Sequence, residues 1–277
     1  MAIAAAIEVG RRFGLVSTRP TIIADSNNTL VHLAPAPLVA KVGTSTIRAF
    51  DSTTLEREVA VASYLAVRRA PVVHPSDDPP AGPHQSRSGA TVSLWRYYEH
   101  VKATDVRAAA VTLRALHTTL AGYSGYLPSF TLEFDGISRF LAGRDALSAL
   151  GDDERGFLLD VKELLRTELA KMGGKDQVLH GAPHFGNLLK TPAGLLWTDF
   201  ETACRGPLEW DLAGFPSGAE AMFPEADAQR LQTLRLVRSL AVSVKSWAQF
   251  GRAPEVDEAA RYHLGLLHDW QKRLKGR

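Results

Sequence analysis

Between residues 180 and 201 the sequence places polar side chains at spacings that suit metal-assisted chemistry. Asn187 ends a loop rich in His, Gly and Asn, and Asp199 follows the next strand along the chain. The segment 188–198 between them is predicted to form a hairpin. Because the two ends of a hairpin lie together, an amide oxygen and a carboxylate oxygen can face one cleft, where such hard ligands suit Mg²⁺. The spacing therefore predicts a magnesium site made by Asn187 and Asp199.

The same loop offers a second type of metal site. His180, His184 and Asp199 are residue types that bind zinc, and a zinc site here would indicate a metallohydrolase. The three positions lack the helix-borne spacing of known zinc motifs. A zinc site would also leave Asn187 without a role, so we favour magnesium.

The elements that would position these residues fall into two parts. The first hundred residues are predicted to form short strands around one helix. The strands are expected at residues 21–25, 29–33, 37–42 and 91–97, which are bounded by turn residues. Apolar residues recur at helical spacing over 52–69, and the proline-rich stretch 74–89 is predicted to be an exposed loop.

The second part of the chain is predicted to be mainly helical. Apolar stripes at helical spacing run through residues 106–120, 157–172, 231–244 and 256–274. The short strands within 178–200 interrupt this pattern. We place the boundary between the two parts at 99–103. A small β lobe followed by a larger helical lobe predicts a cleft between them, which is a common location for ligands.

Composition narrows the possible partners of this chain of 277 residues. Lys and Arg number 32 against 30 Asp and Glu, a balance that argues against a dedicated nucleic-acid binder. The sequence has no run of basic residues that would bind a membrane surface. It also has no uncharged apolar stretch of about 18 to 20 residues, the length that spans a membrane. The apolar N-terminal run lacks the basic residues with which a signal peptide begins. Cys204 is the single cysteine, so the chain cannot form an internal disulfide. We expect a soluble, cytoplasmic protein.

The segment 178–213 resembles the catalytic core of the aminoglycoside phosphotransferase and choline kinase-like family, whose members are relatives of protein kinases. In that family a loop H-G-D-x-x-x-x-N precedes a hairpin and a D-F-E or similar metal-binding triplet. Here the loop is HGAPHFGN at residues 180–187, and the triplet is DFE at residues 199–201. The following GPLEWDLA matches the family's G-P-x-x-x-D-L-A, in which the aspartate, here Asp211, braces the loop.

This resemblance extends over nearly the whole chain and implies an α+β, protein-kinase-like fold of two lobes. A small antiparallel β lobe of five strands, residues 1–98, would bind the nucleotide. A larger helical lobe, residues 99–277, would hold the catalytic loop and the acceptor site. The implied reaction is transfer of a phosphoryl group from ATP or GTP, with Mg²⁺, to a hydroxyl group of a small molecule. The acceptor, the choice of nucleotide and the oligomeric state do not follow from the sequence.

The resemblance also implies a lysine that holds the nucleotide's phosphates. Lys41, in the predicted strand 38–42, matches the lysine that holds the α- and β-phosphates of ATP in that family. Glu58 matches the helix glutamate that orients this lysine through an ion pair, and its spacing to Leu65 fits the family's pattern. Glu56 is the competing candidate.

Two further nucleotide contacts are implied. The hinge between the lobes would bond the adenine edge through backbone groups, and Tyr97 and Tyr98 lie at its centre. The turn between the first two strands carries Ser26, Asn27 and Asn28 in place of a glycine-rich phosphate loop. Short polar residues in a turn can still direct backbone N–H groups at phosphate. An ordinary hairpin turn explains these three residues equally well.

Ala182 departs from the family pattern, because the family places its catalytic aspartate at this position. That aspartate accepts the proton of the attacking hydroxyl group, and a methyl group cannot do so. General-base assistance contributes ~10²–10⁴-fold to the rate. Metal clamping and substrate positioning depend on the residues that remain.

Three explanations of Ala182 stay open. The chain is a natural variant in which another group stands in, such as His184, since an imidazole exchanges protons near neutral pH. Alternatively, it is a pseudokinase that binds nucleotide without turnover and serves as a binding or regulatory module. As a third explanation, it carries a mutation that removes the base. His180, at the start of the loop, is expected to hydrogen-bond the backbone near Asp199.

Overall fold

The computed structural model describes residues 1–25, 28–44, 53–143 and 149–275. The chain divides into two compact units. One comprises Met1–Leu127 with His180–Ala203, and the other comprises Pro128–Leu179 with Cys204–Arg277. The first unit takes in more of the chain than the lobe 1–98 that the sequence predicts, and the predicted lobe boundary stays a prediction.

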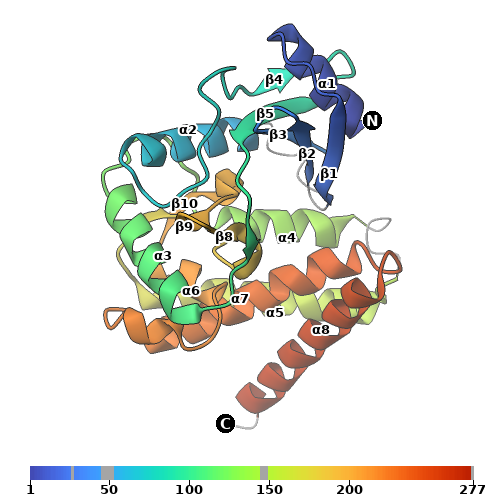
Figure 1. Cartoon of the computed structure of the whole chain (residues 1–277). Coiled ribbons are helices and arrows are strands. Elements are labelled where there is room, and N and C mark those ends of the chain that lie inside the picture. The colour runs from blue at the N-terminus through green and yellow to red at the C-terminus, as the bar shows by residue number, and fades with distance from the viewer. Residues whose placement is uncertain (26–27, 45–52, 144–148, 276–277) are drawn as a thin grey trace. The chain divides into compact units, whose positions relative to one another are not determined.

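A five-stranded antiparallel sheet forms the first part of the first unit (Figure 1). Its strands, in spatial order, are β1 (Arg19–Asp25), β2 (Asn28–Ala34), β3 (Leu38–Gly43), β5 (Thr91–Arg96) and β4 (His84–Gln85). Four of them confirm the predicted strands to within two residues at each end. The fifth strand, β4, lies in the proline-rich stretch, where the sequence predicts a loop. It is a strand because His84 and Gln85 pair with β5.

The two faces of this sheet differ because successive residues of a strand point to opposite faces. On one face Val31, Ala40 and Val92 pack against the helix α1 (Ala2–Arg12). Lys41 follows Ala40 on β3 and therefore points to the face away from α1. The register places Lys41 opposite Leu30 of β2 and Ser93 of β5. A single charged residue is thus carried on a strand whose other positions are mostly apolar.

The first unit contains a helix that the sequence analysis did not predict among its first strands. One helix was expected there, and it is present as α2 (Thr54–Val67). The additional helix is α1, in which Ala5, Ala6 and Val9 are buried against the sheet. The apolar face of α1 is narrow and consists mainly of alanine, so the sequence did not indicate that this segment is a helix packed on the sheet.

The rest of the first unit supports the predicted hairpin. The strands β8 (Leu188–Thr191) and β9 (Gly194–Trp197) pair with each other, and β6 (Val101–Lys102) pairs with β8. Short 3-10 turns lie at both ends of the hairpin, η2 (Phe185–Asn187) before it and η3 (Phe200–Thr202) after it. The helix α3 (Val106–Leu120) contacts the hairpin through Thr112, whose hydroxyl accepts a hydrogen bond from the buried Trp197. The predicted hairpin is confirmed.

The second unit is mainly helical. Its helices are α4 (Leu132–Ala142), α5 (Asp152–Met172), α6 (Leu208–Ala213), α7 (Ala228–Trp247) and α8 (Pro254–Lys275), with the short turn η4 (Ala219–Met222). The strands β7 (Gln177–Leu179) and β10 (Cys204–Gly206) form a small antiparallel pair. Buried residues of α4, α5, α7 and α8 share one apolar core, and α7 and α8 run side by side (Figure 1). This sheet-plus-helices composition confirms the predicted α+β class.

None of the helices in the described part of the chain combines the length and the apolar character that crossing a membrane requires.

Candidate functional site

Lys41 is the centre of a buried ionic cluster in the first unit. Its side chain is 7% exposed, and its Nζ donates to both carboxylate oxygens of Glu58, at 2.9 and 2.8 Å. The same Nζ donates to Oδ1 of Asp199 at 2.8 Å. The predicted ion pair between Lys41 and Glu58 is confirmed. Glu56, the competing candidate, is exposed, whereas Leu55 and Glu58 on the same helix are buried.

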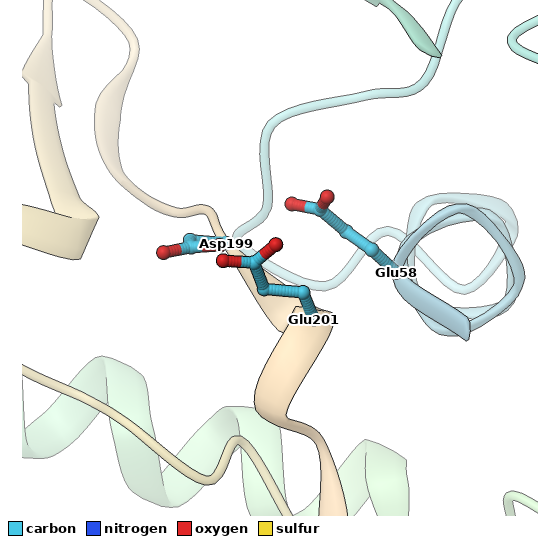
Figure 2. A group of neighbouring side chains, drawn as sticks. All are labelled: Glu58, Asp199 and Glu201. Atoms are coloured by element: carbon cyan, nitrogen blue, oxygen red, sulfur yellow. The ribbon is translucent and has the colours of Figure 1, made fainter. Parts of the chain in front are cut away.

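A third carboxylate completes the cluster and was absent from the predicted site residues. Glu201 is 2% exposed, and its Oε2 lies 3.7 Å from Nζ of Lys41. Glu58, Asp199 and Glu201 each offer an oxygen, and these oxygens lie within 4.8 Å of one another. Figure 2 shows the three carboxylates converging from α2 and from the segment around η3. The D-F-E triplet contains Glu201 and could have indicated it from the sequence. Its position next to Glu58 of α2 follows only from the fold.

The charges of this cluster stabilise the protonated lysine. Burial by itself would lower the pKa of Lys41, but the carboxylates of Glu58 and Asp199 outweigh that effect and hold the pKa above its ordinary value. One ammonium faces three carboxylates, so formal negative charges outnumber positive ones. A divalent cation, which takes oxygen ligands, would compensate this excess.

A cavity of about 260 Å³ opens beside the cluster. Its polar end carries Lys41, Asn187 and Asp199, so both residues predicted to hold magnesium line one space. Its other walls are largely apolar and come from the sheet, the hairpin and the segment that follows α2: Leu30, Val39, Trp95, Leu189 and Val73. A mostly apolar cavity with a few polar and charged groups is the usual form of a binding site for a small molecule.

Residues 96–98, which the sequence predicts to form a hinge, line this cavity. The backbone N–H of Arg96 donates to the carbonyl of His74, and that of Tyr97 donates to the carbonyl of Pro37, at 3.0 and 2.8 Å. Tyr98 lines the cavity, and Nδ1 of His100 lies 2.8 Å from its carbonyl oxygen. The peptide at Tyr98 therefore lies next to the cavity on a backbone that is already fixed.

Tyr97 and Asn28 also line the cavity, but each has a contact that the sequence did not indicate. The ring of Tyr97 stacks on His32, with centroids 3.9 Å apart. Asn28 begins β2, and its side-chain amide donates to both carboxylate oxygens of Glu201. Ser26 and Asn27 lie outside the described residues. The predicted roles of these residues toward a nucleotide stay predictions.

The loop that starts at His180 is held by hydrogen bonds to its own backbone. Nε2 of the buried His180 lies 3.0 Å from the carbonyl oxygen of Thr198, and Nδ1 accepts from the N–H of Ala182 at 3.4 Å. The predicted hydrogen bond from His180 to the backbone near Asp199 is confirmed. Both ring nitrogens face backbone groups, which argues against the zinc alternative. Among the residues that the structure describes, the one group with metal-site spacing contains carboxylates and no histidine.

Two backbone conformations allow the loop and the triplet to meet. Gly181 has φ +89°, and a Cβ at this position would lie 1.8 Å from the carbonyl oxygen of Thr202. Only glycine fits such a close approach. Asp199 has φ +67° and ψ +59°, the left-handed conformation that aspartate adopts more readily than most residues. This turn directs its carboxylate back toward Lys41.

His184 lies on the exposed side of the loop, beside Gly186. A Cβ at Gly186 would lie 2.8 Å from two atoms of the imidazole, so the ring rests against the glycine backbone. Gly186 in turn lines the cavity. Ala182 is half-buried in the same loop. The imidazole therefore lies close to the space that the loop borders.

Asp211 belongs to the second unit, where it is fully buried on α6. Burial lowers the pKa of the nearby Arg238, and the charges of Glu133 and Asp211 counteract that effect. Arg238 also lies over the ring of Trp210, 3.4 Å from its centroid. The bracing role that the resemblance implies for Asp211 stays a prediction.

Comparison with known proteins supports the resemblance seen in the sequence. A model of the phosphotransferase enzyme family matches residues 24–269. Comparison with curated protein sequences finds no match.

Solved structures show the same fold at low sequence identity. The amicoumacin kinase hAmiN, in complex with AMP-PNP, Ca²⁺ and Ami, is 14% identical with a TM-score of 0.72, over 94% of this chain and 92% of that one. A microcompartment-associated aminopropanol kinase is 15% identical with a TM-score of 0.70, and the match covers 99% of this chain and 98% of that one. The GDP and kanamycin complex of APH(2")-IIia is 13% identical with a TM-score of 0.64, over 98% and 99%. These matches confirm the predicted kinase-like fold.

Proposed function

We propose, because the chain belongs to the phosphotransferase enzyme family, that it transfers the terminal phosphoryl group of a nucleoside triphosphate to a hydroxyl group of a small molecule. The observation that carries this proposal is the buried Lys41, held by Glu58 and Asp199 at the polar end of the cavity. A lysine fixed in this way presents a cation to a polyphosphate. As the sequence analysis expects, we place this activity in the cytoplasm.

The residues at the polar end fit a divalent cation. The amide nitrogen of Asn187 donates to the carbonyl of Ala182, which leaves the amide oxygen as the atom for a metal. Asp199 offers a carboxylate oxygen to the same cavity, and Glu201 lies beside it. Bound Mg²⁺ would neutralise the charge that develops on the transferred phosphoryl group. We therefore propose Asn187 and Asp199 as its ligands.

The chain's own residues would orient the nucleotide. Lys41 would pair with phosphate oxygens, while Glu58 keeps the ammonium aimed into the cavity. The apolar walls would hold the base against the hinge peptide at Tyr98. The donor is ATP or GTP: among proteins of this fold, hAmiN was solved with AMP-PNP and APH(2")-IIia with GDP.

Turnover by this chain is expected to be weak because the base position carries Ala182. Positioning and metal clamping supply much of phosphoryl-transfer catalysis, and they depend on residues that are present. The proton of the acceptor hydroxyl would pass to His184, which lies beside the cavity-lining Gly186, or directly to water. The second candidate function, a pseudokinase that binds nucleotide and serves as a binding module, is favoured by Ala182 itself.

Two measurements test the proposal. Nucleotide binding is measured by titrating ATP and GTP into the full chain, with Mg²⁺ and with EDTA. Product formation is then measured with Mg²⁺ and each nucleotide over a panel of acceptors that includes aminopropanol, choline and kanamycin. We expect Mg²⁺-dependent binding that Asp199→Ala abolishes and that Asp269→Ala, an exposed carboxylate on α8, leaves unchanged.

The outcomes separate the two functions. Slow turnover that depends on Asp199 supports the enzyme, and binding without turnover on any acceptor supports the pseudokinase. Failure of the unsubstituted chain to bind either nucleotide contradicts both.

A further inference from the structure

The side chain of Asn28 bonds to a carboxylate that lies 173 residues away in the sequence. Its Nδ2 lies 3.2 Å from Oε1 and 3.0 Å from Oε2 of Glu201. Asn28 is 9% exposed and Glu201 is 2% exposed, so the contact is buried. A hydrogen bond to a buried charge is among the stronger ones that a neutral side chain can make.

Glu201 is held from a second side by the helix α2. The guanidinium of Arg57 donates to the backbone carbonyl of Glu201, with Nε at 3.0 Å and Nη2 at 2.6 Å. The next residue on the helix, Glu58, binds Lys41. Arg57 therefore holds the backbone of Glu201, whereas Asn28 donates to its carboxylate.

The direction of that carboxylate matters for the charge of the whole cluster. With Asn28 in place, the carboxylate of Glu201 faces Lys41 and lies next to those of Glu58 and Asp199. Without the amide donor, the buried carboxylate loses a hydrogen bond, and it gains free energy by turning toward another donor or water. The oxygen geometry that suits a cation would then be lost.

We propose that Asn28 is a positioning residue for the divalent-cation site: its amide holds the Glu201 carboxylate in the cluster with Asp199 and Lys41. This inference rests on the proposed function. It assigns Asn28 a role different from the phosphate contact that the sequence suggested, since its amide donates to a buried carboxylate.

The test measures nucleotide binding as Mg²⁺ is raised, in the unsubstituted chain, Asn28→Ala, Glu201→Gln and the double variant. We expect Asn28→Ala to raise the half-saturating Mg²⁺ concentration about tenfold, the loss expected for one hydrogen bond to a charged group. In EDTA its nucleotide affinity is expected to stay within about twofold of the parent. In the Glu201→Gln background, Asn28→Ala is expected to add almost nothing.

A matched control removes an amide elsewhere in the same sheet. Gln85 on β4 is exposed and donates to Thr91, so Gln85→Ala deletes a side-chain amide without reaching the cluster. Its half-saturating Mg²⁺ concentration should equal that of the parent. Thermal unfolding of each variant shows whether it is folded. Should Asn28→Ala not fold, Asn28→Ser, which keeps a donor, is expected to raise the Mg²⁺ requirement by a smaller factor.

Each alternative gives a distinct result. An equal loss of affinity with Mg²⁺ and in EDTA indicates a direct phosphate contact and overturns the inference alone. Independent, multiplicative effects of the Asn28 and Glu201 substitutions also overturn it, as does an Asn28→Ala variant that matches Gln85→Ala. If the unsubstituted chain binds no nucleotide at any Mg²⁺ concentration, both the inference and the proposed function fail.

Discussion

Asn187 donates its side-chain amide to the backbone carbonyl of Ala182, 3.0 Å away. The bond joins the two ends of the segment 182–187 through a backbone atom. The hydrogen bond therefore does not depend on which side chain stands at position 182, where the resemblance to the family predicts an aspartate.

The first prediction restores the carboxylate. Because the loop is held through backbone atoms, Ala182→Asp should be accommodated without a change in fold. We expect the rate of product formation to rise by roughly 10²–10⁴-fold, the usual contribution of a general base. Steady-state turnover with the best acceptor of the panel measures it. A flat or lower rate would instead indicate a chain that uses another base.

His184 supplies the control for that experiment. If its imidazole takes the proton in the parent chain, His184→Ala should lower the residual turnover at least tenfold, and it should have little effect after Ala182→Asp. Robust turnover by the parent that His184→Ala leaves unchanged contradicts both the vacant base position and the stand-in.

The second prediction compares two glutamates of one helix. Glu58 is buried against Lys41, while Glu56 is exposed two residues earlier. Lys41→Ala is expected to abolish measurable Mg²⁺-nucleotide binding, and Glu58→Gln to weaken it at least tenfold, because the ammonium loses the charge that orients it. Glu56→Gln should bind like the parent. Equal affinities for the two glutamine variants would show that the ion pair does not orient the lysine.

The third prediction concerns the close approach between Gly181 and the backbone of Thr202 in η3. Gly181→Ala would place a Cβ 1.8 Å from a carbonyl oxygen, so the loop must move and nucleotide binding should be lost. Gly194, in the hairpin turn, also has a positive φ, of +125°, but no atom of the described residues lies within 4 Å of the place that a Cβ would take there. Gly194→Ala should therefore cost only some stability, seen as a lower unfolding temperature with normal nucleotide affinity. Normal binding by Gly181→Ala would contradict the close approach.

The fourth prediction concerns stability in the second unit. Glu209 is buried and accepts two bonds from the guanidinium of Arg230, both of 2.9 Å, and one from the N–H of Asp227. Glu209→Ala removes the carboxylate that pairs with this arginine, and we expect unfolding free energy to fall by about 3 kcal/mol. Glu168→Ala, which removes a solvent-exposed pair with Lys171, should cost less than about 1 kcal/mol. Denaturant unfolding measures both.

The pH dependence of this pair has a definite sign. Burial alone would raise the pKa of Glu209, but the bonds from Arg230 and Asp227 outweigh it and hold the pKa below its ordinary value of 4.5. A carboxyl whose pKa is lower in the folded state contributes stability above pH 4.5, and that contribution is lost as the pH falls through the lower folded value. The difference in unfolding free energy between the parent and Glu209→Ala should therefore shrink below pH 4.5. A difference that stays constant to about pH 3 would contradict this.

Local pattern was sufficient for much of the fold. Alternating and helical apolar spacings located four strands of the sheet and the helix α2, because these periodicities follow directly from backbone geometry. The motif around residues 180–201 identified the loop, the hairpin and the residues at its two ends. Helical spacing alone left Glu56 and Glu58 as alternatives, since both lie on the same helix close to the residues that pack inward.

Tertiary structure decided the features that depend on which surfaces meet. Packing of Leu55 on the core turned Glu58 inward and left Glu56 in solvent. The position of the α1 helix depends on its packing against the sheet, because its small alanine face gives little indication of a partner. The pairing of Asn28 with Glu201 joins residues 173 positions apart, and neither one's neighbours in sequence indicate the other. Local sequence determines how a segment can fold, whereas contacts between distant segments depend on burial and charge pairing that exist only once the chain has closed on itself.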